Sequence, residues 1–217
     1  MNIEQARTNM IKQQLRAWDV LDDHLLEVFR TTPREAFVPP AYKGVAFADM
    51  NIPLEHDQIM LIPGEEARLL QAVQIQPTDT VLEIGTGSGY MTALLARLAK
   101  LVYSIDIFPD FTAAAQVKLA THNINNVKLL TADASKGWEQ QGPYDVIIIT
   151  GSLPFLPESF RNSLKPNGRL VAILGNAPAM EATLITRNDR AQWSKQKLFE
   201  TVVPVLINAE PSATFVF

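Results

Sequence analysis

The feature that most constrains this chain is a short apolar run followed at once by three alternating glycines. Residues 81–84 read Val-Leu-Glu-Ile, the pattern of a short buried strand. Next come Gly85, Gly87 and Gly89, and glycine both adopts positive φ and lets a ligand approach the backbone closely. A helical pattern begins at Ser88, and the free N–H groups of a helix's first turn can receive a ligand. The sequence therefore predicts a strand, a tight turn and a helix that form a ligand-binding crevice.

The glycine spacing narrows the class of ligand. A dinucleotide fingerprint needs G-x-G-x-x-G, but the third glycine comes one residue early and Tyr90 holds its place. A P-loop needs Gly-Lys-Ser/Thr after its glycines, and none follows. The next expected strand ends in Asp106, about 20 residues past the glycines, where a carboxylate can accept hydrogen bonds from ribose hydroxyls. This pattern suits a nucleoside without phosphates, of which S-adenosyl-L-methionine is the common one. A βαβ unit with a plain glycine-rich turn is the alternative, and Glu83 before the turn and Asp106 after it favour the cofactor.

Composition sets the broad class of protein. At 217 residues, with 47% hydrophobic and 19% charged residues, the chain has the size and balance of one large globular domain or a domain with an extension. It has no apolar run long enough to span a bilayer, and Met1–Gln5 lacks the basic start of a signal peptide. We therefore expect a cytoplasmic protein without membrane insertion. A net charge of −4 argues against a nucleic-acid partner. Without cysteines, and with three histidines far apart in sequence, no metal site is expected.

The N-terminal part reads as two helices and a long irregular segment. Helices are expected over residues 3–16 and 22–31, with Asp22 as the N-cap of the second. Residues 33–63 carry five prolines and few periodic features, and a segment this long without clear structure is usually functional. It either covers the cofactor crevice or wraps the helices onto the core. We assign residues 1–63 to these helices and an active-site cover segment packed on the core.

Residues 64–217 read as the cofactor-binding domain, in which helices and strands alternate. Helices are expected over residues 64–75, 88–99, 110–122 and 157–164, and strands over 80–84, 101–106, 127–131, 144–150 and 169–174. Two strand-like pieces follow in direct succession, residues 181–187 and 199–207, and predict an antiparallel hairpin at the sheet edge. The expected fold is a doubly wound α/β domain with a mostly parallel, seven-stranded sheet. Its ligand would lie outside the carboxyl ends of the strands.

Two further residues are candidates for this sheet edge. Asp133 follows the strand at 127–131, where its carboxylate can accept a hydrogen bond from an adenine amino group. The alternative is an aspartate that caps a turn. Thr150 ends the strand at 144–150, at the same edge, and can touch either cofactor or substrate.

Several stretches resemble one known family. Residues 81–90 resemble motif I of the class I methyltransferases, which have a Rossmann-like fold, in the version found in protein-L-isoaspartate O-methyltransferases. Residues 33–39, Pro-Arg-Glu-Ala-Phe-Val-Pro, resemble a specific signature of that family. Residues 46–49 with Pro53 and Leu54, residues 144–150 and residues 164–170 resemble its other blocks in order. The resemblance runs from about Met10 to Leu206.

The resemblance implies a function and a set of site residues. The family transfers the methyl group of S-adenosyl-L-methionine to the α-carboxyl of L-isoaspartyl residues, leaving S-adenosyl-L-homocysteine and starting the repair of damaged proteins. A carboxylate is already a nucleophile, so catalysis rests on positioning and desolvation and needs no metal. The partner would be a protein or peptide. The implied cofactor-binding residues are Glu83, Gly85, Thr86, Gly87, Asp106, Ile107, Asp133, Ala134 and Thr150.

One loop departs from the family pattern. The family carries Gly-Gln-Thr-Ile-Ser-x-Pro before the helix that precedes motif I, and its serine is assigned to catalysis. Here Gln58 and Pro63 keep register, but Ile59 replaces the threonine and Leu61 the serine. We therefore assign no catalytic residue in the loop Asp57, Gln58, Ile59, Met60 and Leu61. We expect Ile59, Met60, Leu61 and Ile62 to line an apolar acceptor pocket.

This departure leaves three readings open. The first is a working isoaspartyl methyltransferase with an altered loop. The second is a methyltransferase of the same fold that acts on a more apolar, small-molecule acceptor. The third is a cofactor-binding protein that has lost the activity. The sequence makes no prediction of the oligomeric state.

Overall fold

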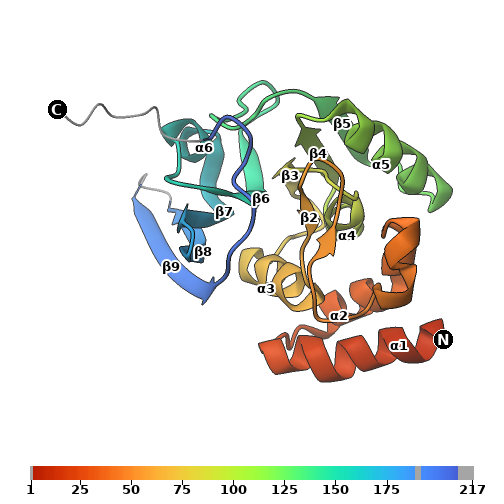
Figure 1. The fold of residues 1–217 in the computed structure, drawn as a ribbon. Coiled ribbons are helices and arrows are strands. Elements are labelled where there is room, and N and C mark those ends of the chain that lie inside the picture. The colour runs from red at the N-terminus through yellow and green to blue at the C-terminus, as the bar shows by residue number, and fades with distance from the viewer. Residues whose placement is uncertain (1, 189–191, 210–217) are drawn as a thin grey trace.

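A seven-stranded sheet lies at the centre of the protein (Figure 1). The computed structural model describes residues 2–188 and 192–209. In order across the sheet the strands are β5 (Val127–Thr131), β4 (Leu101–Asp106), β3 (Thr80–Ile84), β6 (Tyr144–Leu153), β7 (Leu164–Asn176), β8 (Ala179–Arg187) and β9 (Trp193–Glu200). The first five are parallel, and β8 runs antiparallel to both β7 and β9. The predicted mostly parallel sheet with an antiparallel edge hairpin is confirmed.

Helices cover both faces of this sheet. The α-helices are α1 (Ile3–Asn9), α2 (Asp23–Thr31), α3 (Pro63–Val73), α4 (Tyr90–Leu98), α5 (Pro109–Thr121) and α6 (Glu158–Asn162). Val81, Val146 and Val171 of the strands share one core with α2 to α5, whereas Leu82, Ile147 and Leu170 share another with Phe160 of α6. Alternate residues of a strand face opposite sides, so strands buried on both faces must be apolar throughout. This is why β6 reads as a continuous apolar run.

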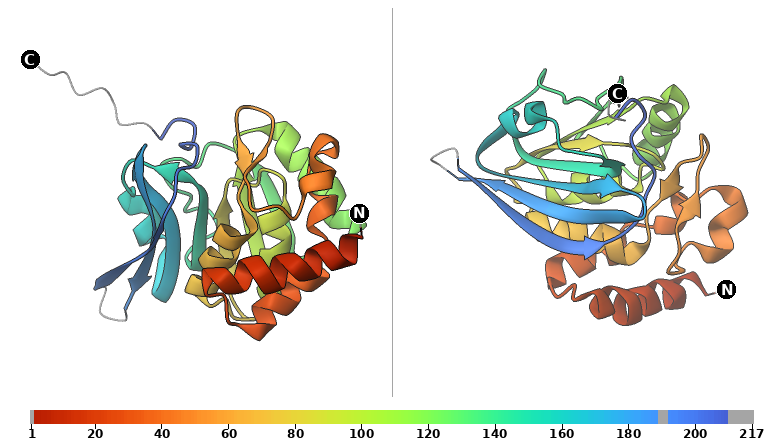
Figure 2. Two further views of the ribbon diagram at one scale, coloured as in Figure 1. Left: turned by 60° about the horizontal axis from the view of Figure 1, so that its bottom comes forward. Right: turned by 60° about the vertical axis from the view of Figure 1, so that its left-hand side comes forward.

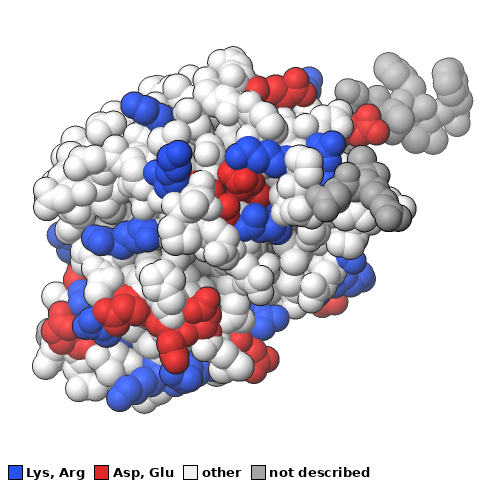
Figure 3. Space-filling view, turned by 180° about the vertical axis from the view of Figure 1, so that it is seen from behind, with Lys and Arg blue, Asp and Glu red and all other residues white. Residues whose placement is uncertain are grey.

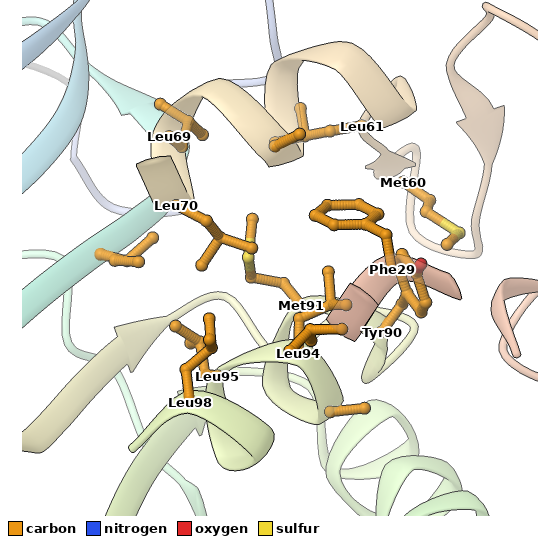
Figure 4. Close-up of a cluster of buried hydrophobic side chains, with 14 of the residues drawn as sticks. Phe29, Met60, Leu61, Leu69, Leu70, Tyr90, Met91, Leu94, Leu95 and Leu98 are labelled. Carbon is orange, nitrogen blue, oxygen red and sulfur yellow. The ribbon is translucent and has the colours of Figure 1, made fainter. Parts of the chain in front are cut away.

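Three helices meet in the larger of the two cores. Figure 4 shows leucines of α3 and α4 packed with Phe29 of α2, Tyr90 and Met91. The rings of Phe29 and Tyr90 lie 6.3 Å apart in an edge-to-face contact. Because α2 touches both α3 and α4, the N-terminal helices form an outer layer on this face of the sheet (Figure 2).

The first helix is less regular than predicted. Only Ile3–Asn9 is α-helical, followed by a π-helical stretch, Met10–Leu15, and a short 3₁₀ turn, Arg16–Trp18. Met10 and Leu15, both fully buried, are five residues apart. A five-residue spacing matches the π-helical hydrogen-bond repeat and not the α-helical one, so the π stretch brings both side chains to the core. The second helix is confirmed, and the Asp22 carboxylate accepts from the N–H of His24, at 2.9 Å.

The irregular segment at residues 33–63 is ordered by a buried arginine. It contains two 3₁₀ stretches, Arg34–Ala36 and Pro40–Val45, and a hairpin of two short strands, β1 (Ile52–Pro53) and β2 (Ile59–Met60). Arg34 is fully buried, and its guanidinium donates to the carbonyl oxygens of Ala46, at 2.8 Å, and Leu61, at 2.6 Å. These bonds join stretches far apart in sequence, so no local pattern could reveal them.

The prediction for the last strand was wrong in position. β9 is Trp193–Glu200, whose side chains are mostly exposed, and not residues 199–207. An exposed edge strand carries no apolar alternation, so the apolar residues that follow it were mistaken for the strand. Residues 201–208, which we name the C-terminal strap, instead cross the sheet edge. The N–H of Ser152 donates to the Pro204 carbonyl at 2.9 Å, and the N–H of Leu206 donates to the Ser152 carbonyl at 2.9 Å.

The described residues offer no membrane span and no metal cluster. None of their helices is both long enough and apolar enough to cross a bilayer. No group of three or more histidine or acidic side chains among them could hold a metal ion. Acidic and basic side chains are interspersed on the face in Figure 3, where the described residues form no continuous basic surface.

Candidate active site

A single cavity lies at the carboxyl ends of β3, β4 and β6, where the doubly wound fold predicts a ligand. It encloses about 860 Å³, including the part open to solvent. The predicted residues in its wall are Gln58, Ile59, Leu61, Gly85, Thr86, Gly87, Asp106, Ile107, Asp133, Ala134 and Thr150. The structure thus gathers eight of the nine predicted cofactor residues and three of the five loop residues around one space.

The glycine turn needs its glycines for two different reasons. Gly85 and Gly87 have φ of +96° and +49°, in the region that residues with a side chain avoid. A Cβ on Gly85 would also lie 2.3 Å from the Thr150 hydroxyl oxygen. That hydroxyl donates to the carbonyls of Ile84, at 3.0 Å, and Gly85, at 2.8 Å. Thr150 therefore braces the turn from the neighbouring strand, a role that the sequence did not show.

Asp106 ties the glycine turn to the next loop. Its carboxylate accepts from the N–H of Gly87, at 2.9 Å, and from the N–H of Phe108, at 3.0 Å. Burial raises the pKa of Asp106, although these hydrogen bonds oppose the rise. The side chain keeps 7% of its surface exposed and lines the cavity. Its position at the end of β4 matches that of a ribose-binding acid.

Glu83 lies beneath the turn and not in the cavity wall. It is fully buried, and one carboxylate oxygen accepts from the Thr92 hydroxyl at 2.5 Å. Ser104 and Thr86, whose hydroxyls are 2.6 Å apart, extend this buried polar layer. Burial raises the pKa of Glu83 to about 8. The second oxygen of Glu83 is buried without a hydrogen-bond partner among the described residues. Glu83 can therefore act on a bound ligand only through the turn.

Asp133 lines the cavity and also caps a turn, the second of the two readings of its sequence position. Its carboxylate accepts from the N–H of Ser135, at 2.9 Å, and from the Asn208 amide of the C-terminal strap, at 2.9 Å. Burial tends to raise the pKa of Asp133, but these hydrogen bonds leave it below its ordinary value. Beside it, the Ser135 hydroxyl is buried and has no hydrogen-bond partner within the described chain. This end of the cavity thus presents polar atoms to a ligand.

The other end of the cavity is formed by the hairpin of β1 and β2. Gln58, Ile59 and Leu61 lie in its wall. Asp57, Met60 and Ile62 do not: Asp57 is exposed at the hairpin tip, Met60 is buried in the core, and Ile62 is the N-cap residue of α3. Alternation along β2 explains the difference, since Met60 faces away from Ile59. Figure 4 shows Leu61 in the same apolar cluster as Phe29 and Met91. The expected apolar wall is present, but with fewer of the loop's residues.

A buried ion pair stands behind this apolar wall. The Arg34 guanidinium pairs with the Glu66 carboxylate, and both side chains are at most 3% exposed. Arg34 also lies 4.9 Å from the centre of the Tyr90 ring. Burial raises the pKa of Glu66 to about 7, although the Arg34 charge opposes the rise. Glu66 lines the cavity, and Arg34 also donates to the carbonyl of Leu61. Arg34 therefore holds an acidic and an apolar residue of the cavity wall.

The charge of the wall fits a cationic nucleoside better than a phosphorylated one. The ionisable residues that line the cavity are Glu66, Asp106 and Asp133, and no lysine, arginine or histidine is among its described lining. A diphosphate would meet the carboxylates of Asp106 and Asp133, while Arg34, the cation behind the wall, is buried and already paired with Glu66. A ligand with a sulfonium and an ammonium group would instead bring positive charges toward these carboxylates. The residues present therefore fit S-adenosyl-L-methionine.

The sequence missed part of the wall. Ile84, Ser88, Met91, Ile105, Phe108, Phe111, Ser135 and Gly151 also line the cavity, as do Pro204, Leu206 and Ile207 of the C-terminal strap. Several of these are neighbours of predicted residues and could have been included on that ground. Nothing in the local pattern of the strap shows that it returns to β6, since that contact is long-range.

Two solved structures show the same fold. A Plasmodium falciparum protein assigned as a protein-L-isoaspartate O-methyltransferase, in complex with S-adenosyl-L-homocysteine, superposes with a TM-score of 0.79 and 18% identity. That match covers 95% of this chain and 98% of the other. A second structure, of a protein-L-isoaspartate O-methyltransferase, gives a TM-score of 0.77 and 24% identity over 92% of this chain and 65% of the other. The fold is therefore that of a Rossmann-like methyltransferase.

Sequence comparison gives the family. The model of the protein-L-isoaspartate(D-aspartate) O-methyltransferase family matches residues 5–209. The protein-L-isoaspartate O-methyltransferase of Koribacter versatilis is 36% identical over 203 residues, which are 93% of this chain and 91% of that protein. The enzyme of the same name from Protochlamydia amoebophila is 38% identical over 82% of this chain and 84% of its own. This chain belongs to the protein-L-isoaspartate O-methyltransferase family.

Proposed function

We propose that this protein transfers the methyl group of S-adenosyl-L-methionine to the α-carboxyl of L-isoaspartyl residues in proteins or peptides. The observation that carries the proposal is the cavity itself, in which a glycine turn, the acid at the end of β4 and an apolar wall meet. The family match over residues 5–209 favours this reaction over transfer to an apolar small molecule. S-adenosyl-L-homocysteine is bound in the related Plasmodium falciparum structure.

The cofactor end of the cavity would hold the nucleoside through groups already in place. Asp106 would accept hydrogen bonds from the ribose hydroxyls, while Gly85 and Gly87 let the methionine part approach the backbone. Asp133, Ala134 and the free hydroxyl of Ser135 would surround the adenine. When bound, the cofactor supplies a methyl group activated by a positively charged sulfur.

The acceptor end would position and desolvate the carboxylate. One of its oxygens forms a bond to the methyl carbon as the carbon–sulfur bond breaks, so a methyl ester and a neutral thioether result. Ile59 and Leu61 would exclude water, which leaves the carboxylate less hydrated and held in line with the methyl group. Neither the formation of the ester bond nor the breaking of the carbon–sulfur bond needs a proton donor. The reaction therefore does not depend on a hydroxyl at position 61.

We also propose a role for the N-terminal part. Residues 1–63 would act as helices and a cover segment on the cofactor-binding part, residues 64–217. The support is that Arg34 binds Leu61 and Glu66, and that Gln58 and Ile59 line the cavity. The cytoplasmic location expected from the sequence stays a prediction.

Labelled S-adenosyl-L-methionine and a pair of peptides test the proposed reaction. One peptide carries an L-isoaspartyl residue, and its twin carries a normal aspartyl residue at the same position. We expect label in the isoaspartyl peptide, in a base-labile ester, and not in the twin. Equal labelling of the two, or no labelling while the cofactor binds, would refute the proposed acceptor.

A further inference from the structure

His56 lies at the tip of the β1–β2 hairpin, which forms the acceptor end of the cavity. It is not in the cavity wall, and its side chain is 39% exposed. Both His56 and Asp57 have positive φ, at +58° and +56°. Such a tip is strained for residues other than glycine and persists only where other contacts hold it.

The contacts of His56 come from the start of α5. Its ring stacks on Phe108 with the ring centres 3.9 Å apart and the planes at 4°. It also meets the edge of Phe111, at 5.4 Å between ring centres. Its Nε2 lies 3.0 and 3.1 Å from the two carboxylate oxygens of Asp110. Phe108 and Phe111 both line the cavity, so His56 holds two side chains of the wall from outside.

The same residue is bound to the acceptor side. The Gln58 amide donates to the His56 carbonyl at 3.0 Å, and Gln58 lines the cavity. The N–H of Leu54 donates to the Gln58 carbonyl at 2.8 Å across the hairpin. On the cofactor side, the N–H of Phe108 donates to Asp106. A continuous series of contacts therefore joins Gln58 to Asp106, and the His56–Phe108 stack is its step from the hairpin to the cavity wall.

We propose that His56 is a positioning residue, whose ring fastens the β1–β2 hairpin to the cofactor wall through Phe108. The hairpin would then support cofactor binding as well as acceptor binding, although none of the predicted cofactor residues lies on it. The inference rests on the proposed function for the identity of the ligand. If the full interaction energy of the stack supports the bound form, removing one ring weakens affinity by about threefold to tenfold.

Calorimetric titration with S-adenosyl-L-homocysteine tests the proposal in four proteins. His56→Ala removes both the stack and the Asp110 contact, whereas His56→Phe keeps an aromatic ring and removes only the Asp110 contact. His24→Ala is the matched control, because His24 is exposed in the first turn of α2 and outside the cavity wall. We expect His56→Ala to bind about threefold to tenfold more weakly than wild type. We expect His56→Phe and His24→Ala to bind within about twofold of wild type.

Amide hydrogen exchange supplies a readout that needs no ligand. In His56→Ala the N–H of Leu54, which is bonded across the hairpin, should exchange faster, and in His24→Ala it should not. Unchanged affinity and exchange in His56→Ala would overturn the proposal, as would a loss in His56→Phe equal to that in His56→Ala. If wild type itself failed to bind, the proposed function would fall and this inference with it. Binding by wild type with no effect of His56→Ala would overturn this inference alone.

Discussion

The two ends of the cavity are built by different means. At the cofactor end, the residues lie on neighbouring strands: the turn after β3, Asp106 at the end of β4 and Thr150 in β6. Hydrogen bonds from Thr150 to the turn and from the turn to Asp106 hold them together. At the acceptor end, the wall comes from a hairpin outside the main sheet and is fixed by Arg34, from a distant part of the chain. Each end has a buried glutamate behind it. Glu66, at the acceptor end, pairs with the charged Arg34, whereas Glu83, at the cofactor end, accepts a hydrogen bond from the uncharged Thr92 hydroxyl.

The comparison shows which part of the cavity is formed by the central sheet and which part by the segment at residues 33–63. Parallel strands place their carboxyl ends together, so a local motif at each strand end is enough to assemble the cofactor end. The acceptor end depends on side-chain contacts between segments far apart in sequence. Side-chain changes at residues 59 and 61, which leave the His56–Phe108 contact in place, can therefore alter the acceptor pocket while the cofactor end stays intact. The following predictions test this separation, from the largest expected effect to the smallest.

Arg34→Met should have the largest effect, and on the acceptor end first. It leaves the Glu66 charge buried without its partner and frees the carbonyls of Ala46 and Leu61, so we expect a loss of about 3–5 kcal/mol in the free energy of unfolding. Urea unfolding followed by circular dichroism measures it. Adding Glu66→Leu removes the unpaired charge and should recover part of the loss. If the single variant were as stable as wild type, the ion pair would not hold this segment.

Asp106→Ala should abolish binding at the cofactor end. The carboxylate accepts from the N–H groups of Gly87 and Phe108 and is the proposed ribose ligand, so its loss should weaken S-adenosyl-L-homocysteine binding by about 100-fold or more. Calorimetry gives the affinity, and a thermal melt shows whether the variant is folded. The control is Asp23→Ala, an exposed aspartate in the first turn of α2. Wild-type affinity in folded Asp106→Ala would remove Asp106 from the site.

Glu83→Gln should change how stability depends on pH. Because the folded-state pKa is raised to about 8 from an ordinary 4.5, the folded protein holds this proton more tightly than the unfolded chain does. The resulting stabilisation is complete below the ordinary value and is lost as the pH rises toward 8. Glutamine cannot ionise, so we expect the variant to exceed wild type by about 2–3 kcal/mol near pH 7 when the two are matched near pH 5. Parallel stability curves for the two proteins would contradict a buried, protonated Glu83.

Leu61→Ser should have the smallest effect, and it should be confined to the acceptor end. The serine hydroxyl can hydrogen-bond an acceptor carboxylate, and one such bond corresponds to about a twofold to tenfold gain in kcat/KM for an isoaspartyl peptide. Affinity for S-adenosyl-L-homocysteine should stay within about twofold of wild type. Initial rates and calorimetry on one preparation provide both values. A large fall in cofactor affinity would show that the two ends are not separable at this residue.

Most of the fold followed from local patterns in the sequence. The β-branched run of β6 and the glycine turn after β3 are dictated by neighbours in sequence, and both lie where predicted. The π-helical stretch at Met10–Leu15 and the strand β9 were missed. The first depends on the core that receives the two side chains, and the second pairs through its backbone while its side chains remain exposed.

The site residues also divide into those that local sequence predicts and those that depend on long-range contacts. Asp106 and Thr150 could be predicted because parallel strands place their carboxyl-terminal parts at the ligand-binding edge, although β6 continues to Leu153, beyond the predicted end at Thr150. The strap residue Leu206 could not, because it is placed at the cavity by long-range contacts with β6, through its backbone bond to Ser152 and its side chain beside Gly151. Glu83 was predicted from its motif alone, and its side chain turns toward Thr92, on the far side of the turn from the cavity.

The most direct test of the central claim is a crystal structure of the protein with S-adenosyl-L-homocysteine and an L-isoaspartyl peptide. The account predicts ribose hydroxyls within hydrogen-bonding distance of the Asp106 carboxylate and the isoaspartyl carboxylate against Ile59 and Leu61, in one cavity. A nucleoside bound away from Asp106, or a peptide whose isoaspartyl carboxylate lies outside that wall, would contradict it.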